Sequence, residues 1–288
     1  MTDPRHPRRL LYEGLLRRAL LEDLGGAGDL TTDAIVPEGA RAEASFVARR
    51  EGRIAGLRVA IDALRLLDPT LDARIEHGDG ADASAGARLA AVAGDARAIL
   101  TGERVALNFL GRLSGIATAT REIVRAIAEH PAKVADTRKT TPGLRLLEKY
   151  AVRVGGGANH RFGLDDALLI KDNHVAAAGG VRPAVERART AAGHTLRIEL
   201  EVDSLAQLDE AIALGVDLVL LDNFSLRDLA AAVRRTGGRA VLEASGGITL
   251  QTAPAIAATG VDLLSAGWLT HSAPALDVAL EFEVRSGG

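Results

Sequence analysis

The chain has 288 residues, of which 47% are hydrophobic and 25% charged, so it can bury a substantial core as one large domain or two coupled ones. A net charge of −3, an aromatic content of 3% and dispersed arginines disfavour binding to a nucleic-acid polymer, and the lack of cysteine excludes disulfides, thiolate metal sites and a cysteine nucleophile. There is no signal peptide and no run of about 18 apolar residues, so we expect no membrane contact and a cytoplasmic location.

The first half of the chain has the pattern of an α+β domain. Residues 8–24 carry leucines at helical spacing and end at Gly25-Gly26, which is typical of a helix stop. Four segments follow in chain order: strands over 42–56, an amphipathic helix over 57–68, a turn-rich stretch over 78–100, and a long helix over 102–130 with a break near Ser114-Gly115.

From Lys133 onward, short apolar runs alternate with helical segments, which predicts βαβ units and a parallel sheet. Polar groups stand at the carboxyl ends of all six runs, whereas a doubly wound sheet would concentrate such groups at one switch point. The sequence therefore favours a β/α barrel with its active site at the ends of the strands. The runs are KVADT, ALLIKD, RIELEV, DLVLLDN, AVLEAS and VDLLSAG, and the residues at their ends are Asp136, Arg138, Lys139, Lys171, Asp172, Glu201, Asp222, Glu243, Ser245 and Gly267.

Residues 136–162 form a basic window with only two acids, although the chain as a whole is acidic. Arg138 and Lys139 emerge at a strand end, which favours contact with an anionic substrate over a structural role. Arg145, Lys149 and Arg153 are spaced four residues apart. This spacing favours a single solvated face of a helix for these three side chains. Lysine is scarce, either by chance or because an ammonium group is needed at Lys133, Lys139, Lys149 and Lys171.

A glycine run precedes His160 and Arg161 in GGGANHRF, and this setting favours an anion clamp. A lone histidine is more often a packing or surface residue. Asp172 and His174, in KDNH, could simply cap or orient their neighbours.

Glu201 and Asp222 end neighbouring strands of the predicted barrel. Either one alone would more often be a helix cap, but as a pair they could hold Mg²⁺, which leaves coordination positions for phosphate oxygens. The glycine-flanked loops 244–249 and 265–272 supply backbone amides, and phosphate commonly binds at the last strands of barrels.

Taken together, these motifs closely resemble the quinolinate phosphoribosyltransferases, the carboxylating nicotinate-nucleotide pyrophosphorylases. The resemblance covers nearly the whole chain, with two small departures: Val154 where the family often has cysteine, and Trp268 where it usually has alanine. It rests on ALLEDLGGAGDLTTDA, GERVALNFLGRLSGIAT, TRKTTPG, GGGANHR, LIKDNH, LEVDS, LLDNFS, LEASGGI and GWLTHSAPALD.

This resemblance implies an α/β fold with an N-terminal open α/β sandwich and an incomplete parallel α/β barrel of about six strands. The implied ranges are 1–115 for the sandwich, 116–272 for the catalytic barrel and 273–288 for a C-terminal segment that returns to the first domain.

The implied enzyme is a pentosyltransferase of de novo NAD biosynthesis. It joins quinolinate to phosphoribosyl pyrophosphate with Mg²⁺ and yields nicotinate mononucleotide, pyrophosphate and CO₂. Both substrates are polyanions, which explains the basic window. The resemblance assigns quinolinate to Arg138, Lys139, His160, Arg161, Lys171 and Arg104; Mg²⁺ and the ribose hydroxyls to Glu201 and Asp222; and phosphate to Ser245, Gly246, Gly247, Gly267 and His271, with Lys139, Lys171, Glu201 and Asp222 as the catalytic set.

The resemblance also implies a homodimer, in which Arg104 reaches the barrel of the partner subunit; further assembly of dimers stays open. From the sequence alone, Arg104 would instead be a solvated helix arginine. Two alternatives remain: a related barrel transferase for another pyridine base, and a non-catalytic phosphosugar-binding protein. The Glu201 and Asp222 pair argues against the second, because ligand capture alone needs no metal carboxylates.

Overall fold

The computed structural model describes residues 6–284, which form two compact units. Unit 1 comprises residues 1–121, 141–156 and 272–288, and unit 2 comprises residues 122–140 and 157–271. The division differs from the predicted ranges mainly at residues 141–156, which pack within unit 1 because Tyr150 is buried and its hydroxyl donates to Asp79 Oδ2 at 2.7 Å. The ends of the predicted first and last segments, residues 1–5 and 285–288, lie outside the described residues.

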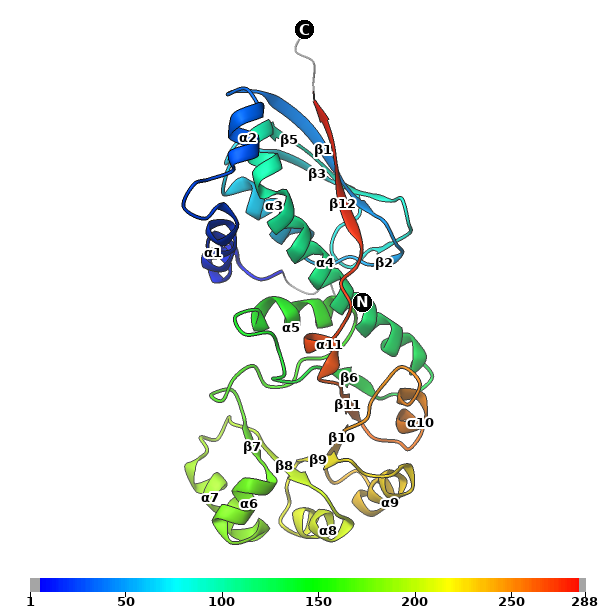
Figure 1. Cartoon of the computed structure of the whole chain (residues 1–288). Helices are drawn as coiled ribbons and strands as arrows, with labels where there is room; N and C mark the ends of the chain where they lie inside the picture. Colours follow the sequence, from blue (N-terminus) through cyan, green and yellow to red (C-terminus); the bar gives the residue numbers. More distant parts are fainter. Residues whose placement is uncertain (1–5, 285–288) are drawn as a thin grey trace. The chain divides into compact units, whose positions relative to one another are not determined.

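Unit 1 is built on an antiparallel sheet with strand order β12-β1-β5-β3. Helix α3 and the first turns of α4 lie over one face of this sheet (Figure 1). Phe46 of β1 is fully buried at the centre of the sheet, between Ala90 and Leu280 of the flanking strands. The elements are η1 (Arg9–Leu11), α1 (Glu13–Leu24), α2 (Leu30–Ile35), β1 (Arg41–Ala48), β2 (Gly52–Arg53), α3 (Leu57–Arg65), β3 (Asp72–Ile75), β4 (Asp82–Ala83), β5 (Arg88–Asp95), α4 (Ala96–Ala126), α5 (Arg145–Val154) and β12 (Val278–Val284).

The helix predicted over residues 8–24 is confirmed from Glu13 to Leu24 as α1, whereas Arg9–Leu11 form the short 3-10 helix η1. Gly25 follows the end of α1 with a φ of 56°. The strands and the helix predicted over 42–68 are confirmed as β1, β2 and α3. The turn-rich prediction for 78–100 missed β5, because its small apolar residues give little strand signal but pair with both neighbouring strands.

The predicted break near Ser114-Gly115 is wrong, since α4 is continuous from Ala96 to Ala126. Ser114 is fully buried, and its hydroxyl accepts from the Ala55 N–H at 3.0 Å and donates to the Ala55 carbonyl at 3.1 Å. At Gly115, a Cβ atom would overlap the carbonyl oxygen of Pro274. The glycine therefore allows close packing of the C-terminal segment and does not end the helix.

Replacing Gly115 with alanine is expected to lower the free energy of unfolding by about 1–3 kcal/mol, because the backbone at Pro274 must move. Gly14 in α1 is the matched control, since its nearest neighbour would lie 3.8 Å from a new Cβ. Gly14→Ala should be neutral or stabilising by up to about 1 kcal/mol. Urea denaturation would measure both, and equal stabilisation by the two changes would contradict the packing argument.

Unit 2 contains a parallel sheet with strand order β6-β11-β10-β9-β8-β7, which confirms the six predicted strands. Consecutive helices lie side by side along one side of the sheet (Figure 1). This architecture is consistent with an incomplete barrel. The elements are β6 (Lys133–Ala135), β7 (Leu168–Ile170), α6 (Asp172–Ala178), α7 (Val181–Ala191), β8 (Ile198–Val202), α8 (Leu205–Ala213), β9 (Leu218–Asp222), α9 (Leu226–Thr236), β10 (Val241–Ser245), α10 (Ala253–Ala257), β11 (Leu263–Ser265) and α11 (Trp268–His271).

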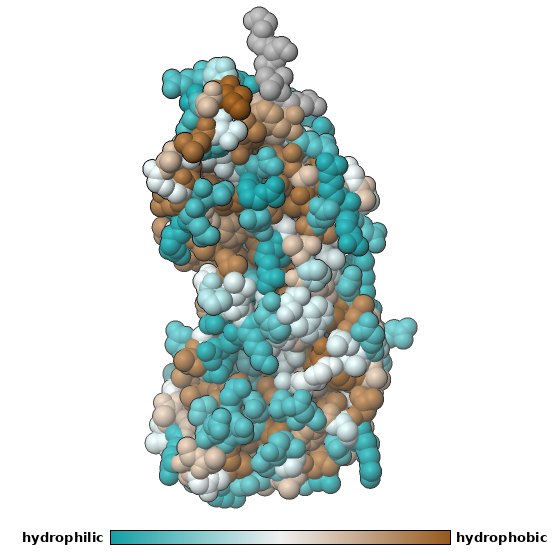
Figure 2. Space-filling view, in the orientation of Figure 1, coloured by the Kyte–Doolittle hydropathy of each residue, from teal (hydrophilic) through white to brown (hydrophobic). Residues whose placement is uncertain are grey.

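The surface carries many polar residues. On the face drawn in Figure 2, hydrophilic residues are widespread and smaller groups of hydrophobic residues are interspersed with them. Within residues 6–284, none of the helices combines the length and the apolar character needed to cross a membrane.

Candidate active site

A cavity of 280 Å³ in unit 2 gathers side chains from the carboxyl ends of the barrel strands. Short strands bring these residues together because the ends of parallel strands meet at one edge of a sheet. The cavity is mixed in charge, with five predicted cationic or histidine residues and three carboxylates. Its lining residues are Thr137, Arg138, Lys139, His160, Arg161, Leu169, Lys171, Glu201, Leu220, Asp222, Glu243, Ser245 and Ser265. We call it the main cavity.

A second cavity of 590 Å³ adjoins the main cavity and is lined by the two glycine loops. Five residues line both cavities: Thr137, Lys139, Asp222, Ser245 and Ser265. The second cavity also contains Gly246, Gly247, Gly267, Trp268 and His271, so the predicted phosphate residues are together. We call it the glycine-loop cavity.

At two of these glycines, a neighbouring side chain lies so close to the backbone that there is no room for a Cβ atom. Gly246 has a φ of +94°, and a Cβ there would overlap the side chain of Asn223. At Gly267, a Cβ would lie 2.8 Å from Lys139 Cδ, so the glycine makes room for the lysine stem. The indole of Trp268 donates to the Ile248 carbonyl at 2.8 Å and so joins the two loops.

The loop that carries Arg138 and Lys139 is held by backbone contacts. The Thr137 hydroxyl accepts from the Lys139 N–H at 2.9 Å, and the fully buried Thr270 hydroxyl donates to the Lys139 carbonyl at 2.8 Å. These bonds hold the backbone of Lys139, and the residue lines both cavities. Burial, and then the charge of Arg138, lower the pKa of Arg161.

Lys171 begins helix α6, where its N–H donates to His174 Nδ1 at 2.9 Å. The capping role considered for His174 is therefore confirmed. The Lys171 ammonium lies 3.2 Å from Glu201 Oε2, so these two residues pair within the main cavity.

Glu201 and Asp222 are half-buried at the ends of the neighbouring strands β8 and β9. Asp222 Oδ2 accepts from the Asn223 amide at 2.8 Å. Two carboxylates beside an open cavity fit Mg²⁺, which takes few protein ligands and completes its shell with water and substrate oxygens.

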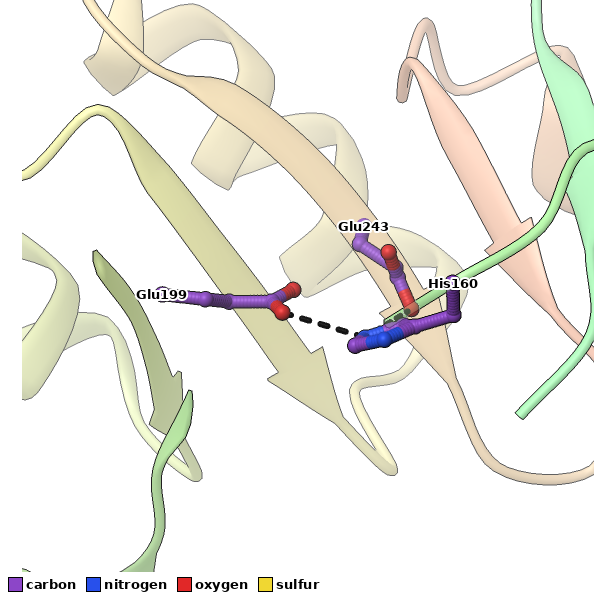
Figure 3. A group of neighbouring side chains, drawn as sticks. All are labelled: His160, Glu199 and Glu243. Carbon is purple, nitrogen blue, oxygen red and sulfur yellow. Dashed lines mark ion pairs between the residues drawn. The ribbon is translucent and has the colours of Figure 1, made fainter. Parts of the chain in front are cut away.

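His160 lies at the wall of the main cavity between two buried glutamates (Figure 3). Its Nε2 is 3.0 Å from Glu199 Oε2 and 3.6 Å from Glu243 Oε1. Its Nδ1 accepts from the Arg161 N–H at 2.7 Å, so the proton of a neutral ring is on Nε2. His160 thus contacts both glutamates and the Arg161 backbone while it lines the main cavity, and its part in an anion clamp stays a prediction.

Glu199 and Glu243 were not predicted as site residues. Burial first, and then the charge of Glu199, raise the pKa of Glu243 to about 7. One signal could have revealed Glu199: in RIELEV it is two residues from Glu201, and residues i and i+2 of a strand point to the same side. Glu243 occupies an apolar strand, where an acidic residue is uncommon.

Two groups of predicted residues lie in unit 1 instead. Arg104 is exposed on α4 and lines a 350 Å³ cavity with Glu22, Asp23 and Arg112. The solvated face predicted for α5 is wrong at Lys149, which is 2% exposed. A period-four pattern of charges does not reveal which side of a short helix is packed.

The sequence matches two family domains that together span most of the chain. They are described as "Quinolinate phosphoribosyl transferase, N-terminal domain", over residues 29–114, and "Quinolinate phosphoribosyl transferase, C-terminal domain", over residues 116–281.

Similar proteins include a "Probable nicotinate-nucleotide pyrophosphorylase [carboxylating]" of Bacillus subtilis, 48% identical over 272 residues, covering 94% of this chain and 93% of the relative. A "Nicotinate-nucleotide pyrophosphorylase [carboxylating]" of Mycobacterium leprae is 49% identical over 278 residues, covering 92% and 95%. The crystal structure of NadC from Streptococcus pyogenes has 42% identity and a TM-score of 0.94, covering 97% of this chain and 99% of that one.

Proposed function

This chain belongs to the quinolinate phosphoribosyltransferase family, and from that premise we propose that it transfers phosphoribosyl from phosphoribosyl pyrophosphate to quinolinate. The products are nicotinate mononucleotide, pyrophosphate and CO₂, and the reaction serves de novo NAD biosynthesis. The observation that carries the proposal is the pair of adjoining cavities, one lined by cationic side chains and the other by glycine loops, with Lys139 and Asp222 in both.

The main cavity suits an acid with two carboxylates. Arg138, Arg161 and Lys171 supply separate cationic groups around it, and guanidinium groups bind carboxylates through paired hydrogen bonds. Leu169 and Leu220 add an apolar surface for the pyridine ring. His160 contributes by its position beside Arg161.

The glycine-loop cavity suits the phosphate groups of the second substrate. Ser245, Gly246, Gly247 and Gly267 offer small side chains and backbone near the ligand, and His271 stands at the same cavity. Glu201 and Asp222 would hold Mg²⁺ and the ribose hydroxyls. When bound, the metal supplies positive charge to the departing pyrophosphate.

The chain's own residues then act by charge and position. Lys139 lies beside both cavities, where its ammonium can offset negative charge as the bond from ribose C1 to pyrophosphate breaks. The ribose carbon then has oxocarbenium character, and the pyridine nitrogen attacks it without a covalent enzyme intermediate. Leu169 and Leu220 help to keep water from the ring during the loss of CO₂.

A homodimer with composite sites is part of the proposal, and so is a cytoplasmic location. Large apolar side chains are exposed on the N-terminal helices of unit 1, where a partner subunit would cover them. These residues are Leu10, Leu11, Leu21, Leu30 and Ile35.

One coupled assay tests the proposed function. Purified protein is given quinolinate, phosphoribosyl pyrophosphate and Mg²⁺, and both pyrophosphate and CO₂ are measured. The expected result is one CO₂ for each pyrophosphate. Binding of phosphoribosyl pyrophosphate with no release of either product would favour a non-catalytic phosphosugar-binding protein.

Lys139→Ala and Lys171→Ala are each expected to lower kcat/KM by at least about 2 kcal/mol in transition-state terms, because each removes a charge that faces substrate. Lys133→Ala is the matched control, since Lys133 is exposed at the start of β6. Circular dichroism should show an unchanged fold in all three variants. An equal loss of activity in Lys133→Ala and Lys171→Ala would contradict the assignment.

A further inference from the structure

We propose that Glu243 is the acid that gives a proton to the pyridine carbon from which CO₂ departs. This inference rests on the proposed function and adds a catalytic residue to it.

The reaction requires such a proton. As the bond between the ring carbon and the carboxylate breaks, CO₂ leaves and the electron pair of that bond forms a new bond from the ring carbon to hydrogen. Because the proton arrives as CO₂ departs, the rate of CO₂ release depends on the proton donor. The donor therefore has to carry a proton near neutral pH and to face the pyridine ring.

Glu243 meets the positional requirement. Glu243 lies on β10 and is only 3% exposed, yet it lines the main cavity together with Arg138, Arg161 and Leu220. Glu199, its neighbour across His160, does not line that cavity. Glu243 is thus the glutamate of this buried pair that adjoins the proposed pyridine site.

The surroundings of Glu243 favour its protonated form. The Nε2 atom of His160 lies closer to Glu199 than to Glu243, at 3.0 Å against 3.6 Å. Glu243 Oε1 is buried and lacks a hydrogen-bond partner among the described residues. Asp136 and Glu199 oppose ionisation of Glu243, and His160 and Ser265 favour it. Burial and the nearby Glu199 therefore favour a proton on Glu243, in accord with a pKa raised to about 7.

A route for reprotonation exists on the other side of the barrel. A cavity of 310 Å³ is lined by Glu199 and by Leu218 and Leu263, at the starts of β9 and β11. It shares His160, Arg161 and Glu243 with the main cavity. After Glu243 has donated its proton to the ring carbon, its carboxylate takes a new one from water in this cavity.

A metal-binding site is the alternative interpretation of this cluster, because the ligand atoms of His160, Glu199 and Glu243 lie within 4.8 Å of one another. The hydrogen bond from the Arg161 N–H to His160 Nδ1 argues against it. A metal on Nε2 would leave the ring with no proton on either nitrogen. A proton on Glu243 needs no such imidazolate.

The test is a single-turnover reaction of Glu243→Gln with quinolinate, phosphoribosyl pyrophosphate and Mg²⁺. Glutamine keeps the shape of the side chain but cannot donate an acid proton. Pyrophosphate release is expected to stay within about threefold of the unchanged protein, while CO₂ release falls about 10²-fold or more. The phosphoribosylated dicarboxylate should accumulate. In the unchanged protein the CO₂ step should slow as the pH rises through about 7, and in Glu243→Gln this dependence should be absent.

Glu199→Gln is the matched control, because it also removes a buried charge beside His160. Glu199→Gln should release one CO₂ for each pyrophosphate, even if its overall turnover is slower than that of the unchanged protein. Equal losses of pyrophosphate and CO₂ release in Glu243→Gln would overturn the proposal in favour of a positioning role. Unchanged CO₂ release in this variant would also overturn the proposal, because Glu243 would not be needed as an acid. Tightly bound metal in the purified protein, lost in Glu243→Gln, would overturn it in favour of a metal site. Absence of pyrophosphate from the unchanged protein would instead count against the proposed function.

Discussion

Nicotinate is expected to be a very poor substrate, with a kcat/KM on the order of 10⁴-fold below that of quinolinate. Nicotinate lacks the second carboxylate, so it could not form one of the two sets of charged contacts that quinolinate is proposed to make with the main cavity. Arg138, Arg161 and Lys171 together offer more positive charge than one carboxylate can use. Leaving a buried polar group without a partner costs far more than losing a contact of apolar surface.

Steady-state rates with saturating phosphoribosyl pyrophosphate would measure this ratio. Picolinate, the pyridine acid with only the carboxylate next to nitrogen, is the matched control and should be similarly poor. Turnover of nicotinate within tenfold of quinolinate would show that the cations of this cavity do not select a dicarboxylate.

Subunit mixing is expected to restore activity between two nearly inactive variants, Arg104→Ala and Lys171→Ala. Arg104 lies in unit 1 and is exposed on α4, whereas Lys171 lines the main cavity of unit 2. If Arg104 acts in the partner's site, a mixed dimer has one site with both changes and one with neither. Its activity should reach about half of that of the unchanged dimer.

The matched control mixes Lys139→Ala with Lys171→Ala, because both residues belong to the same cavity. Each site of that mixed dimer keeps one change, so no activity should return. Native mass spectrometry would verify that subunits had exchanged. No recovery in the Arg104 mixture after verified exchange would return Arg104 to a surface role.

Much of the architecture could be predicted from local patterns. The six apolar runs from Lys133 onward became the six parallel strands, and Gly25 ends α1 as expected. Periodicity and helix stops depend on neighbours in sequence, so they can be detected without knowing the fold. The motifs around Arg138, Arg161 and Lys171 likewise indicated a polyanion site, and these residues line one cavity.

Contacts between residues that are distant in sequence could not be predicted from local patterns. Ser114-Gly115 has the local character of a break, yet contacts with Ala55 and Pro274 make both residues suit a continuous helix. Lys149 has the spacing of a solvated residue but is buried.

The family, the strands and the basic character of the site could be predicted from the amino-acid sequence, because each depends on residue type and short spacing. The neighbours of the His160 ring, in contrast, depend on the tertiary structure. Glu199 is 39 residues later in the chain and Glu243 a further 44, yet both carboxylates converge on the ring. The protonation of a buried group depends on charges and desolvation in three dimensions, so no local pattern could reveal it.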